Sequence, residues 1–376
     1  MNPDPEAPVT RDKAAPLRAC EGSRGRSTFR SRSPLGGFHL VNKHRVPRLA
    51  VVGCGAIARS FYLPAMVSGS EKPDIVLVDR SLEQARSLAS EFGIGETAAD
   101  HLEVVDGVDG AVVATPPATH APIALDFLRA GVPVLCEKPL AARYPEAVSL
   151  VNGADDLGVP LGVNQVLRLY PALRKARELY RAGAVGELRR VQLLDGTPYG
   201  WPLVTNTVFG RDGQGRGVLA DIGAHMLDGI CWLLDDRPAL RSYRDDSMGG
   251  AEGVARVEFE LGRCAGVVHL SWISKLPGEF LIEGTDGYLR GRLKSRDPLT
   301  LGAAGGSRTR RIRLGPDMAG PGGVPRFVID NLIQVVRGQA EPFAPARTVL
   351  PSLQLIDECY ASRDRLHMPW MEWQEA

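Results

Sequence analysis

Residues 48–58 read Arg-Leu-Ala-Val-Val-Gly-Cys-Gly-Ala-Ile-Ala. The run Leu49–Val52 has the length and β-branching of a buried strand, and it breaks into a turn at Gly53. This is the G-x-G-x-x-A form of the dinucleotide fingerprint: Gly53 permits a sharp turn, Gly55 leaves room for a pyrophosphate, and Ala58 lets the next helix pack closely. The stretch predicts a nucleotide-binding βαβ unit.

A second strand ends in an acid at the spacing that this fingerprint requires. Asp74–Asp79 reads Asp-Ile-Val-Leu-Val-Asp, and Asp79 lies 21 positions past Ala58. A carboxylate there suits the two ribose hydroxyls of NAD and repels the 2′-phosphate of NADP, whereas the neighbouring Arg80 would suit that phosphate. The unit is therefore predicted to bind NAD, with NADP left open.

The composition is that of an ordinary globular protein. The chain has 376 residues, of which 44% are hydrophobic and 24% charged, and its formal net charge is +1. This length suggests two domains, and the charge balance argues against a general nucleic-acid binder. No apolar run reaches membrane-spanning length, so we expect no membrane partner.

The six cysteines are scattered and include no C-x-x-C pair. Most stand within apolar runs, which favours buried small hydrophobic residues over disulfides or a zinc site. Free thiols and the lack of a secretory segment indicate a cytoplasmic protein. Residues 1–45 are rich in Pro, Ser, Gly and Arg without apolar periodicity, and we expect a disordered N-terminal extension there.

Two halves with different patterns follow this extension. Residues 46–164 alternate strands with helices, which predicts an α/β domain with a doubly wound, parallel Rossmann sheet covered on both faces. Residues 165–376 predict an α+β domain with a mostly antiparallel open sheet, one face of which is covered by helices. Two glycine-rich stretches in this half, 196–217 and 302–323, look like long loops.

Hydrophobic periodicity predicts the individual elements. Helices are expected at 81–93, 120–130, 170–182, 326–337 and 348–363, and strands at 110–115, 132–136, 188–194, 255–261, 266–272, 280–283 and 310–314. In open α/β sheets ligands bind beyond the carboxyl ends of the strands, which is where Thr115 and Lys138 fall.

Lys138 stands between Glu137 and Pro139 at such a strand end. An ordinary surface lysine in a turn is the alternative interpretation. At the ligand-binding edge of a nucleotide fold, however, a lysine can hydrogen-bond a substrate oxygen and stabilise negative charge on it. The position therefore favours a functional lysine.

Asp221, His225 and Asp228 form the second candidate group. On a helix their spacing places them on one face, so that a carboxylate and a proton-shuttling imidazole point the same way. The alternative makes Asp221 an N-cap and His225 a buried, hydrogen-bonded core residue. Zinc binding would need more ligands than this spacing offers, so no metal site is expected.

Four motifs together resemble the glucose-fructose oxidoreductase and inositol dehydrogenase family, known as Gfo/Idh/MocA. They are Val-Val-Gly-Cys-Gly-Ala-Ile-Ala at 51–58, Ala-Thr-Pro-Pro at 114–117 with His120, Gly-Val-Pro-Val-Leu-Cys-Glu-Lys-Pro-Leu at 131–140, and Asp-Ile-Gly-Ala-His at 221–225. In order and spacing the resemblance spans residues 46–370, and Glu-Lys-Pro with Asp-x-Gly-x-His is far more specific than the glycine turn.

The resemblance implies a nicotinamide-dependent oxidoreductase acting on a sugar, aminosugar, cyclitol or related polyol, with a C-terminal sheet that often forms a homo-oligomer interface. It matches the family's catalytic residues to Lys138, Asp221 and His225. The fingerprint and the resemblance together predict these cofactor contacts: Gly53, Gly55, Ala56, Ile57, Asp79, Arg80, Thr115, Pro116, His120, Glu137 and Lys138.

Residues 164–171, Asn-Gln-Val-Leu-Arg-Leu-Tyr-Pro, resemble a subgroup of the family in which His-Val-Leu-Arg-Tyr is usual. Gln165 replaces the histidine and Leu169 the tyrosine, while Arg168 is retained. The substrate-side candidates are Arg168, Tyr170, Tyr199, Trp201 and Asn206.

We expect His225 to accept the proton of a secondary hydroxyl while Lys138 hydrogen-bonds the same oxygen and Asp221 orients the substrate, as a hydride passes to the nicotinamide. The same site could run in reverse and reduce a keto-sugar. Two other classes are a non-redox enzyme that uses transient oxidation, like the NAD-dependent glycosidases, and a non-catalytic nucleotide sensor. The joint presence of the three catalytic candidates counts against the sensor.

Overall fold

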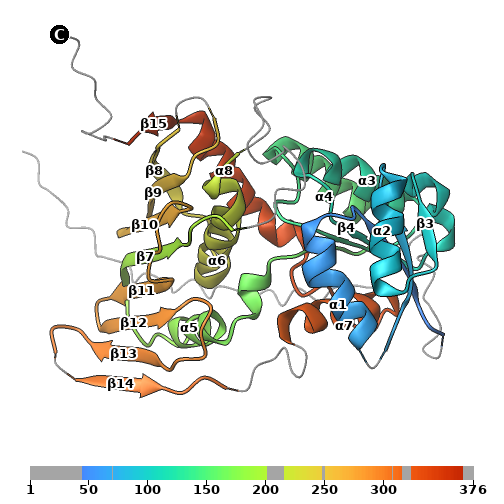
Figure 1. The fold of residues 1–376 in the computed structure, drawn as a ribbon. Coiled ribbons are helices and arrows are strands. Elements are labelled where there is room, and N and C mark those ends of the chain that lie inside the picture. Colours follow the sequence, from blue (N-terminus) through green and yellow to red (C-terminus); the bar gives the residue numbers. More distant parts are fainter. Residues whose placement is uncertain are drawn as a thin grey trace, which may run out of the picture. The chain divides into compact units, whose positions relative to one another are not determined.

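The computed structural model describes residues 45–69, 71–200, 216–247, 250–306, 308–315 and 323–366. All of them belong to one compact unit, Gly36–Ala376. The predicted N-terminal extension, Cys20, Trp201 and Asn206 lie outside the described residues. Two β-sheets organise the described residues, one from the first half of the chain and one from the second (Figure 1).

The first sheet is the predicted parallel Rossmann sheet. Its strands lie in the order β3-β2-β1-β4-β5-β6, and every neighbouring pair is parallel. They are β1 (Arg48–Val52), β2 (Asp74–Val78), β3 (Glu96–Ala98), β4 (Gly110–Val113), β5 (Val134–Cys136) and β6 (Leu161–Val163). Because the order reverses beside β1, the carboxyl ends of β1 and β4 flank the place where nucleotides bind in such folds.

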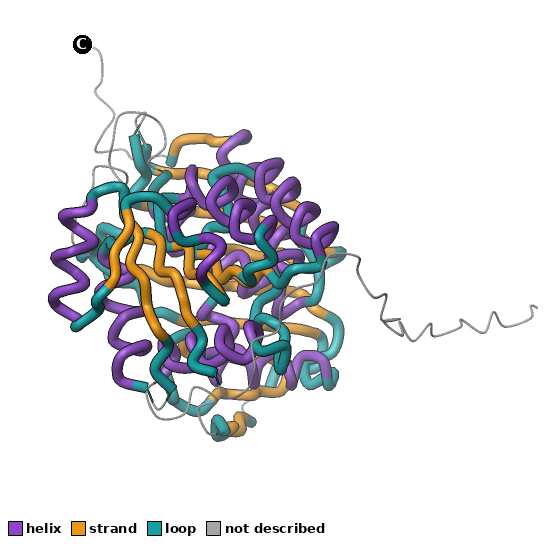
Figure 2. The backbone as a smooth tube through the Cα atoms, turned by 90° about the vertical axis from the view of Figure 1, so that its right-hand side faces the viewer, coloured by secondary structure: helices purple, strands orange, loops and turns teal. Residues whose placement is uncertain are grey.

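Helices cover both faces of this sheet (Figure 2). They are α1 (Leu63–Ser68), α2 (Leu82–Phe92), α3 (Pro117–Arg129), α4 (Tyr144–Leu157) and α7 (Gly323–Val336). Alternate residues of β1 face opposite sides: Leu49 and Val51 pack with α1, α2 and α7, whereas Ala50 and Val52 pack with α3 and α4. Helix α7 comes from the second half of the chain but packs on the first sheet. The domain boundary predicted at residue 164 stays a prediction.

Local sequence signals set the ends of these helices. The Ser81 side chain accepts a hydrogen bond from the Gln84 backbone N–H at the start of α2, and Gly93 ends it in the left-handed conformation, with φ of 68°. Helix α3 begins three residues before the predicted start, because Pro117 fits the first turn of a helix. Helix α4, which begins with Tyr144 and Pro145, was not predicted.

The second sheet has nine strands in the order β14-β13-β12-β11-β7-β10-β9-β8-β15. They are β7 (Leu188–Gly196), β8 (Ala239–Asp245), β9 (Val254–Leu261), β10 (Cys264–Ser271), β11 (Glu279–Gly284), β12 (Gly287–Arg292), β13 (Leu299–Ala303), β14 (Thr309–Ile312) and β15 (Arg363–Arg365). Six of the eight pairings are antiparallel, while β7 with β10 and β8 with β15 are parallel. The prediction of a mostly antiparallel sheet is confirmed.

Helices α5 (Pro171–Arg181), α6 (Ala224–Leu234) and α8 (Leu350–Ala361) pack on one face of the second sheet, as predicted. The strand predicted at 310–314 is confirmed as β14, which forms a hairpin with β13, so the overlapping prediction of a long loop at 302–323 is wrong for its first part. The glycine that suggested a loop serves packing instead: a Cβ at Gly302 would lie 2.2 Å from the ring of Tyr288 on the neighbouring strand.

Five cysteines lie in the described part of the chain, and all five are buried and unpaired. Within that part no helix is both long and apolar enough to span a membrane. Nor do its His, Cys, Asp and Glu side chains gather into a group of three or more that would bind a metal ion.

Candidate active site

A cleft of about 1470 Å³ lies where residues from both halves of the chain meet. Thr115 and Lys138, from loops after strands of the first sheet, line it together with Asp221, His225 and Tyr170. Other residues lining the cleft are Ala56, Ile57, Pro116, Glu137, Asn164, Tyr199, Arg216, Trp272, Lys294 and Tyr360. The cleft thus brings together all three predicted catalytic residues and most of the predicted cofactor contacts.

The glycine turn leaves space where a pyrophosphate would approach. Gly53 has φ of 100°, and a Cβ there would lie 2.6 Å from the carbonyl oxygen of Ala114, so only glycine fits. At Gly55 a Cβ would meet no atom within 4 Å. The turn is therefore tight on its inner side and open on its outer side, as a dinucleotide site requires.

Asp79 is held beside that turn at the end of β2. Its Oδ2 accepts a hydrogen bond from the Cys54 backbone N–H at 2.9 Å, and its Oδ1 accepts one from the Ser81 backbone N–H, also at 2.9 Å. Each carboxylate oxygen retains a further lone pair, so both oxygens can still accept ribose hydroxyls. Arg80, the next residue, is exposed.

Lys138 reaches across the cleft to the second half of the chain. Its Nζ forms an ion pair with Asp221 Oδ1 and donates a hydrogen bond to the Asp221 backbone oxygen at 3.3 Å. Burial alone would lower the pKa of this ammonium, but the carboxylates of Asp221 and Glu137 outweigh burial and raise it. Lys138 is therefore a stable cation that can donate a hydrogen bond.

Glu137 is fixed by three donors inside the protein. Its Oε1 accepts hydrogen bonds from the Tyr62 hydroxyl at 2.6 Å and the Asn164 side-chain amide at 2.8 Å, while Oε2 accepts the Lys138 backbone N–H at 3.0 Å. The carboxylate thus orients the lysine that follows it. Tyr62 and Asn164 were not singled out from the sequence, because they lie 75 and 27 positions from Glu137 and no local pattern links them.

His120 does not line the cleft, contrary to its predicted place among the cofactor contacts. Its side chain is fully buried behind Thr115, with Nε2 2.6 Å from the Thr115 backbone oxygen and Nδ1 2.9 Å from the Pro139 backbone oxygen. Burial lowers the pKa of its ring, although the two carbonyls oppose this. His120 therefore links the two loops that carry Thr115 and Pro139.

Asp221 lies in a π-helical turn, Leu219–Gly223, that leads directly into α6. It is therefore not the N-cap that the alternative interpretation proposed. Burial opposes its ionisation, but the Lys138 ammonium more than compensates and lowers the pKa of the Asp221 carboxyl. Asp221 and His225 line the same cleft, whereas Asp228 is buried in an ion pair with Arg168, so the predicted common face of the three side chains stays a prediction.

His225 follows this turn and lines the cleft. Its Nδ1 lies 3.0 Å from Gln165 Oε1, and Gln165 Nε2 donates to the Ala224 backbone oxygen at 3.4 Å. Burial and the nearby Lys138 charge lower the pKa of His225 to about 3, although Asp221 opposes them. The imidazole is therefore uncharged at neutral pH, and it is neither fully buried nor a member of the core.

Arg168, a predicted substrate contact, does not line the cleft. Its guanidinium is buried and donates two hydrogen bonds to the carboxylate of Asp228, at 2.8 and 2.6 Å, and one to Thr348 Oγ1 at 2.7 Å. These contacts lock the segment before α5 to α6. Tyr170, the other predicted substrate residue, does line the cleft, and so does Tyr199.

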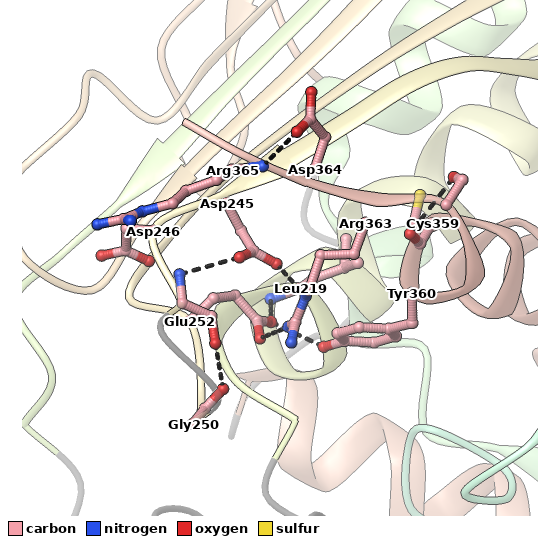
Figure 3. A network of polar contacts seen from close by, with 12 residues as sticks. Leu219, Asp245, Asp246, Gly250, Glu252, Cys359, Tyr360, Arg363, Asp364 and Arg365 are labelled. Atoms are coloured by element: carbon pink, nitrogen blue, oxygen red, sulfur yellow. Dashed lines mark hydrogen bonds and ion pairs between the residues drawn. The ribbon is translucent and has the colours of Figure 1, made fainter. Parts of the chain in front are cut away.

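Glu252 anchors the start of the π-helical turn. Its Oε1 accepts the Leu219 backbone N–H at 3.1 Å and the Tyr360 hydroxyl at 2.7 Å, and its Oε2 accepts from Arg363 at 2.9 Å (Figure 3). Arg363, on the last strand, also pairs with Asp245 at 2.6 Å. Burial raises the pKa of the Glu252 carboxyl, although the hydrogen bonds from Tyr360 and Leu219 act to lower it. The C-terminal strand is thereby tied to the turn that carries the predicted catalytic aspartate.

Family models match both halves of this architecture. The oxidoreductase family model with an NAD-binding Rossmann fold, GFO/IDH/MocA, matches residues 47–165, and the C-terminal domain model of the same family matches residues 173–290. The chain belongs to the Gfo/Idh/MocA family. It therefore belongs to a family of NAD(P)-dependent oxidoreductases.

Several curated relatives are named for sugar chemistry. The chain is 32% identical over 255 residues to 1,5-anhydro-D-fructose reductase of Ensifer adhaerens, covering 65% of this chain and 75% of that protein. It is 32% identical over 211 residues to dTDP-3,4-didehydro-2,6-dideoxy-α-D-glucose 3-reductase of Streptomyces violaceoruber, covering 55% of this chain and 61% of that protein.

Solved structures share the fold at low sequence identity. A 3-ketoreductase from Actinomadura kijaniata, in complex with NADP and TDP-benzene, has a TM-score of 0.72 at 20% identity, covering 86% of this chain and all of that one. An oxidoreductase from Agrobacterium radiobacter in complex with NAD⁺, L-tartaric acid and magnesium has a TM-score of 0.71 at 20% identity, covering 85% of this chain and 96% of that chain.

Proposed function

We propose that this protein transfers a hydride between a nicotinamide cofactor and a secondary alcohol or ketone of a sugar, aminosugar or cyclitol. The observation that carries the proposal is the meeting of a charged Lys138 and a neutral His225 in one cleft beside the glycine turn. The names of the curated relatives favour a sugar-like substrate.

The cofactor side of the proposal rests on the fit of the chain to a dinucleotide. The open space above Gly55 would take the pyrophosphate, and the Asp79 carboxylate would take the ribose hydroxyls, which favours NAD over NADP. Thr115, Pro116 and Ile57 line the adjoining cleft. When bound, the nicotinamide ring supplies the hydride chemistry, and the protein supplies position and charge.

The substrate oxygen would lie between Lys138 Nζ and His225 Nε2. During oxidation His225 takes the hydroxyl proton while the lysine ammonium donates a hydrogen bond to the oxygen, which stabilises its developing negative charge. During reduction His225 returns that proton to the substrate oxygen, while Lys138 keeps its hydrogen bond to it. Asp221 keeps Lys138 protonated, so the lysine acts as a donor and the histidine as the base.

Turnover of NAD and of NADP against a panel of sugars, aminosugars and cyclitols tests this proposal, followed by nicotinamide absorbance with Lys138→Ala as the control. We expect net reduction with one class of polyol, lost in the variant, and a preference for NAD. Glycosidic bond cleavage without net cofactor reduction would instead indicate the transient-oxidation enzyme. Tight NAD binding with no reaction in either direction, on polyols or their keto forms, would indicate a sensor.

Three further expectations stay predictions: a cytoplasmic location, a homo-oligomeric state, and a substrate-side role for Tyr170. The five buried, unpaired thiols support the first. Sedimentation of the purified protein tests the second, and a monomer at working concentration would contradict it. Tyr170→Phe tests the third: a raised substrate KM at unchanged cofactor affinity is the expected result.

A further inference from the structure

Gln165 has no role in the mechanism above, although its side chain contacts the proposed base. It is 3% exposed, and the backbone on both sides of it is hydrogen-bonded: its N–H donates to Val163 O at 2.7 Å, and its carbonyl accepts from Arg168 N at 3.1 Å. A buried side chain on so constrained a backbone has little freedom to turn away from its partners.

The orientation of its amide follows from what each end can reach. Gln165 Nε2 is a donor, and it lies 3.4 Å from the Ala224 backbone oxygen, which can only accept. Its Oε1 therefore faces His225 Nδ1 at 3.0 Å. Because Oε1 has no proton to give, a hydrogen bond forms only when His225 carries its proton on Nδ1.

This contact determines which ring nitrogen is free. A neutral imidazole has one N–H and one lone pair, so protonation at Nδ1 leaves the lone pair on Nε2. Within the described residues Nε2 has no recorded hydrogen-bond partner, and His225 lines the cleft. With the opposite tautomer, Nε2 would donate and could not act as a base.

We propose that Gln165 is a positioning residue that holds His225 in the tautomer with Nδ1 protonated and thereby presents Nε2 as the proton acceptor. The proposal rests on the function proposed above, but the tautomer of His225 can be measured without substrate or cofactor. The rest of the segment supports it, since the Arg168–Asp228 ion pair holds the same two elements together three residues further along each.

Nitrogen NMR of the protein labelled in its histidine side chains reads the tautomer directly. The chain has seven histidines, and the signals that disappear in His225→Gln identify those of His225. We expect a protonated Nδ1 and a bare Nε2 at neutral pH in the unmodified protein. A protonated Nε2 there would overturn the proposal without any variant having to fold.

Two variants test whether Gln165 is the cause. Gln165→Met keeps the length of the side chain but removes the acceptor, so the tautomer should become mixed or reversed, and kcat should fall about 10- to 100-fold at unchanged cofactor affinity. Gln165→Glu keeps an acceptor, so it should keep the tautomer and most of kcat. Because its charge favours the imidazolium, it should also move the acid limb of the pH profile to higher pH.

Thr348→Val is the matched control, since it removes a hydrogen bond from Arg168 on the same segment without touching His225. It should leave the tautomer and kcat unchanged. An unchanged tautomer in Gln165→Met would overturn the proposal. Failure of the proposed function looks different: His225→Gln would then retain full turnover, whatever the tautomer of the histidine.

Discussion

Two side-chain contacts join the segment 165–168 to helix α6, and they differ in whether a polar atom remains without a partner in the described part of the chain. Gln165 contacts His225, and three residues further along each segment Arg168 contacts Asp228. In the second contact both carboxylate oxygens are bound, at 2.8 and 2.6 Å, and both side chains are buried. In the first, one ring nitrogen remains open to the cleft. The second contact therefore has no free group to offer a ligand, whereas the first leaves a ring nitrogen that a ligand can reach.

The largest effect should come from breaking the satisfied contact. Arg168→Met leaves the buried Asp228 carboxylate unpaired, and we expect a loss of about 3–5 kcal/mol in the free energy of unfolding, measured by urea denaturation. Turnover per folded molecule should change little. The double variant Arg168→Met/Asp228→Leu should recover most of the lost stability. A stability loss under about 1 kcal/mol with abolished turnover would reverse the roles that we assign to the two contacts.

The next largest effect should be the loss of turnover when Lys138, which lines the same cleft as His225, is replaced. Lys138→Met should reduce kcat by about 10²- to 10³-fold, because the substrate oxygen loses its charged donor. The unfolding midpoint should also fall, because Asp221 loses its ion-pair partner, so kcat is measured per folded molecule at saturating cofactor. Lys175→Met, which removes a lysine paired with Glu178 on the surface of α5, is the control. Equal losses in both variants would show that Lys138 has no special role.

The pH dependence of turnover should show that His225, the histidine of the open contact, stays neutral. Since burial and the Lys138 charge lower the pKa of His225 to about 3, the base stays neutral as the pH falls through 6.5. The kcat/KM for oxidation should therefore show no acid limb with a midpoint near pH 6.5. A limb at that pH, absent from His225→Gln, would mean that the histidine titrates normally.

The same shift makes a prediction for stability. The unfolded chain binds a proton at His225 near its ordinary pKa, while the folded protein does not until far lower pH. The contribution of the neutral His225 ring to the free energy of unfolding is thus complete above pH 6.5, and it is lost as the pH falls toward 3. His225→Gln should be less sensitive to acid over that window, as measured by thermal unfolding.

The smallest effect should come from the cofactor end of the site. Asp79→Asn keeps an acceptor for one backbone N–H but removes the charge, so NAD affinity should fall about tenfold, or about 1.4 kcal/mol, and NADP should gain relative to NAD. Asp74→Asn, at the other end of the same strand, is the control. Unchanged relative affinity for the two cofactors, measured by calorimetry, would remove Asp79 from cofactor selection.

The features that the sequence predicted well are those with local causes. The turn at Gly53, the helix between Ser81 and Gly93, and the parallel sheet all follow from neighbouring residues and from the alternation of strands with helices. The convergence of Lys138, Asp221 and His225 on one cleft also agrees with the prediction.

The missed features depend on partners distant in sequence. The ion pair of Arg168 with Asp228 could not be predicted, because the two residues lie 60 positions apart. His120 was placed at the cofactor, although it is buried against carbonyls of two separate loops. The π-helical turn that holds Asp221 follows no local periodicity, and its anchor Glu252 lies 33 residues from the Leu219 N–H that it binds.

The central claim is that His225 accepts the proton of the reacting hydroxyl. Single-turnover reduction of the bound cofactor tests it most directly, once the substrate panel has identified a reactive polyol, with wild type and His225→Gln compared at saturating substrate. We predict a rate about 10²- to 10⁴-fold slower in the variant, with cofactor affinity and folding nearly unchanged. A variant that reduces the cofactor at the wild-type rate would contradict the account.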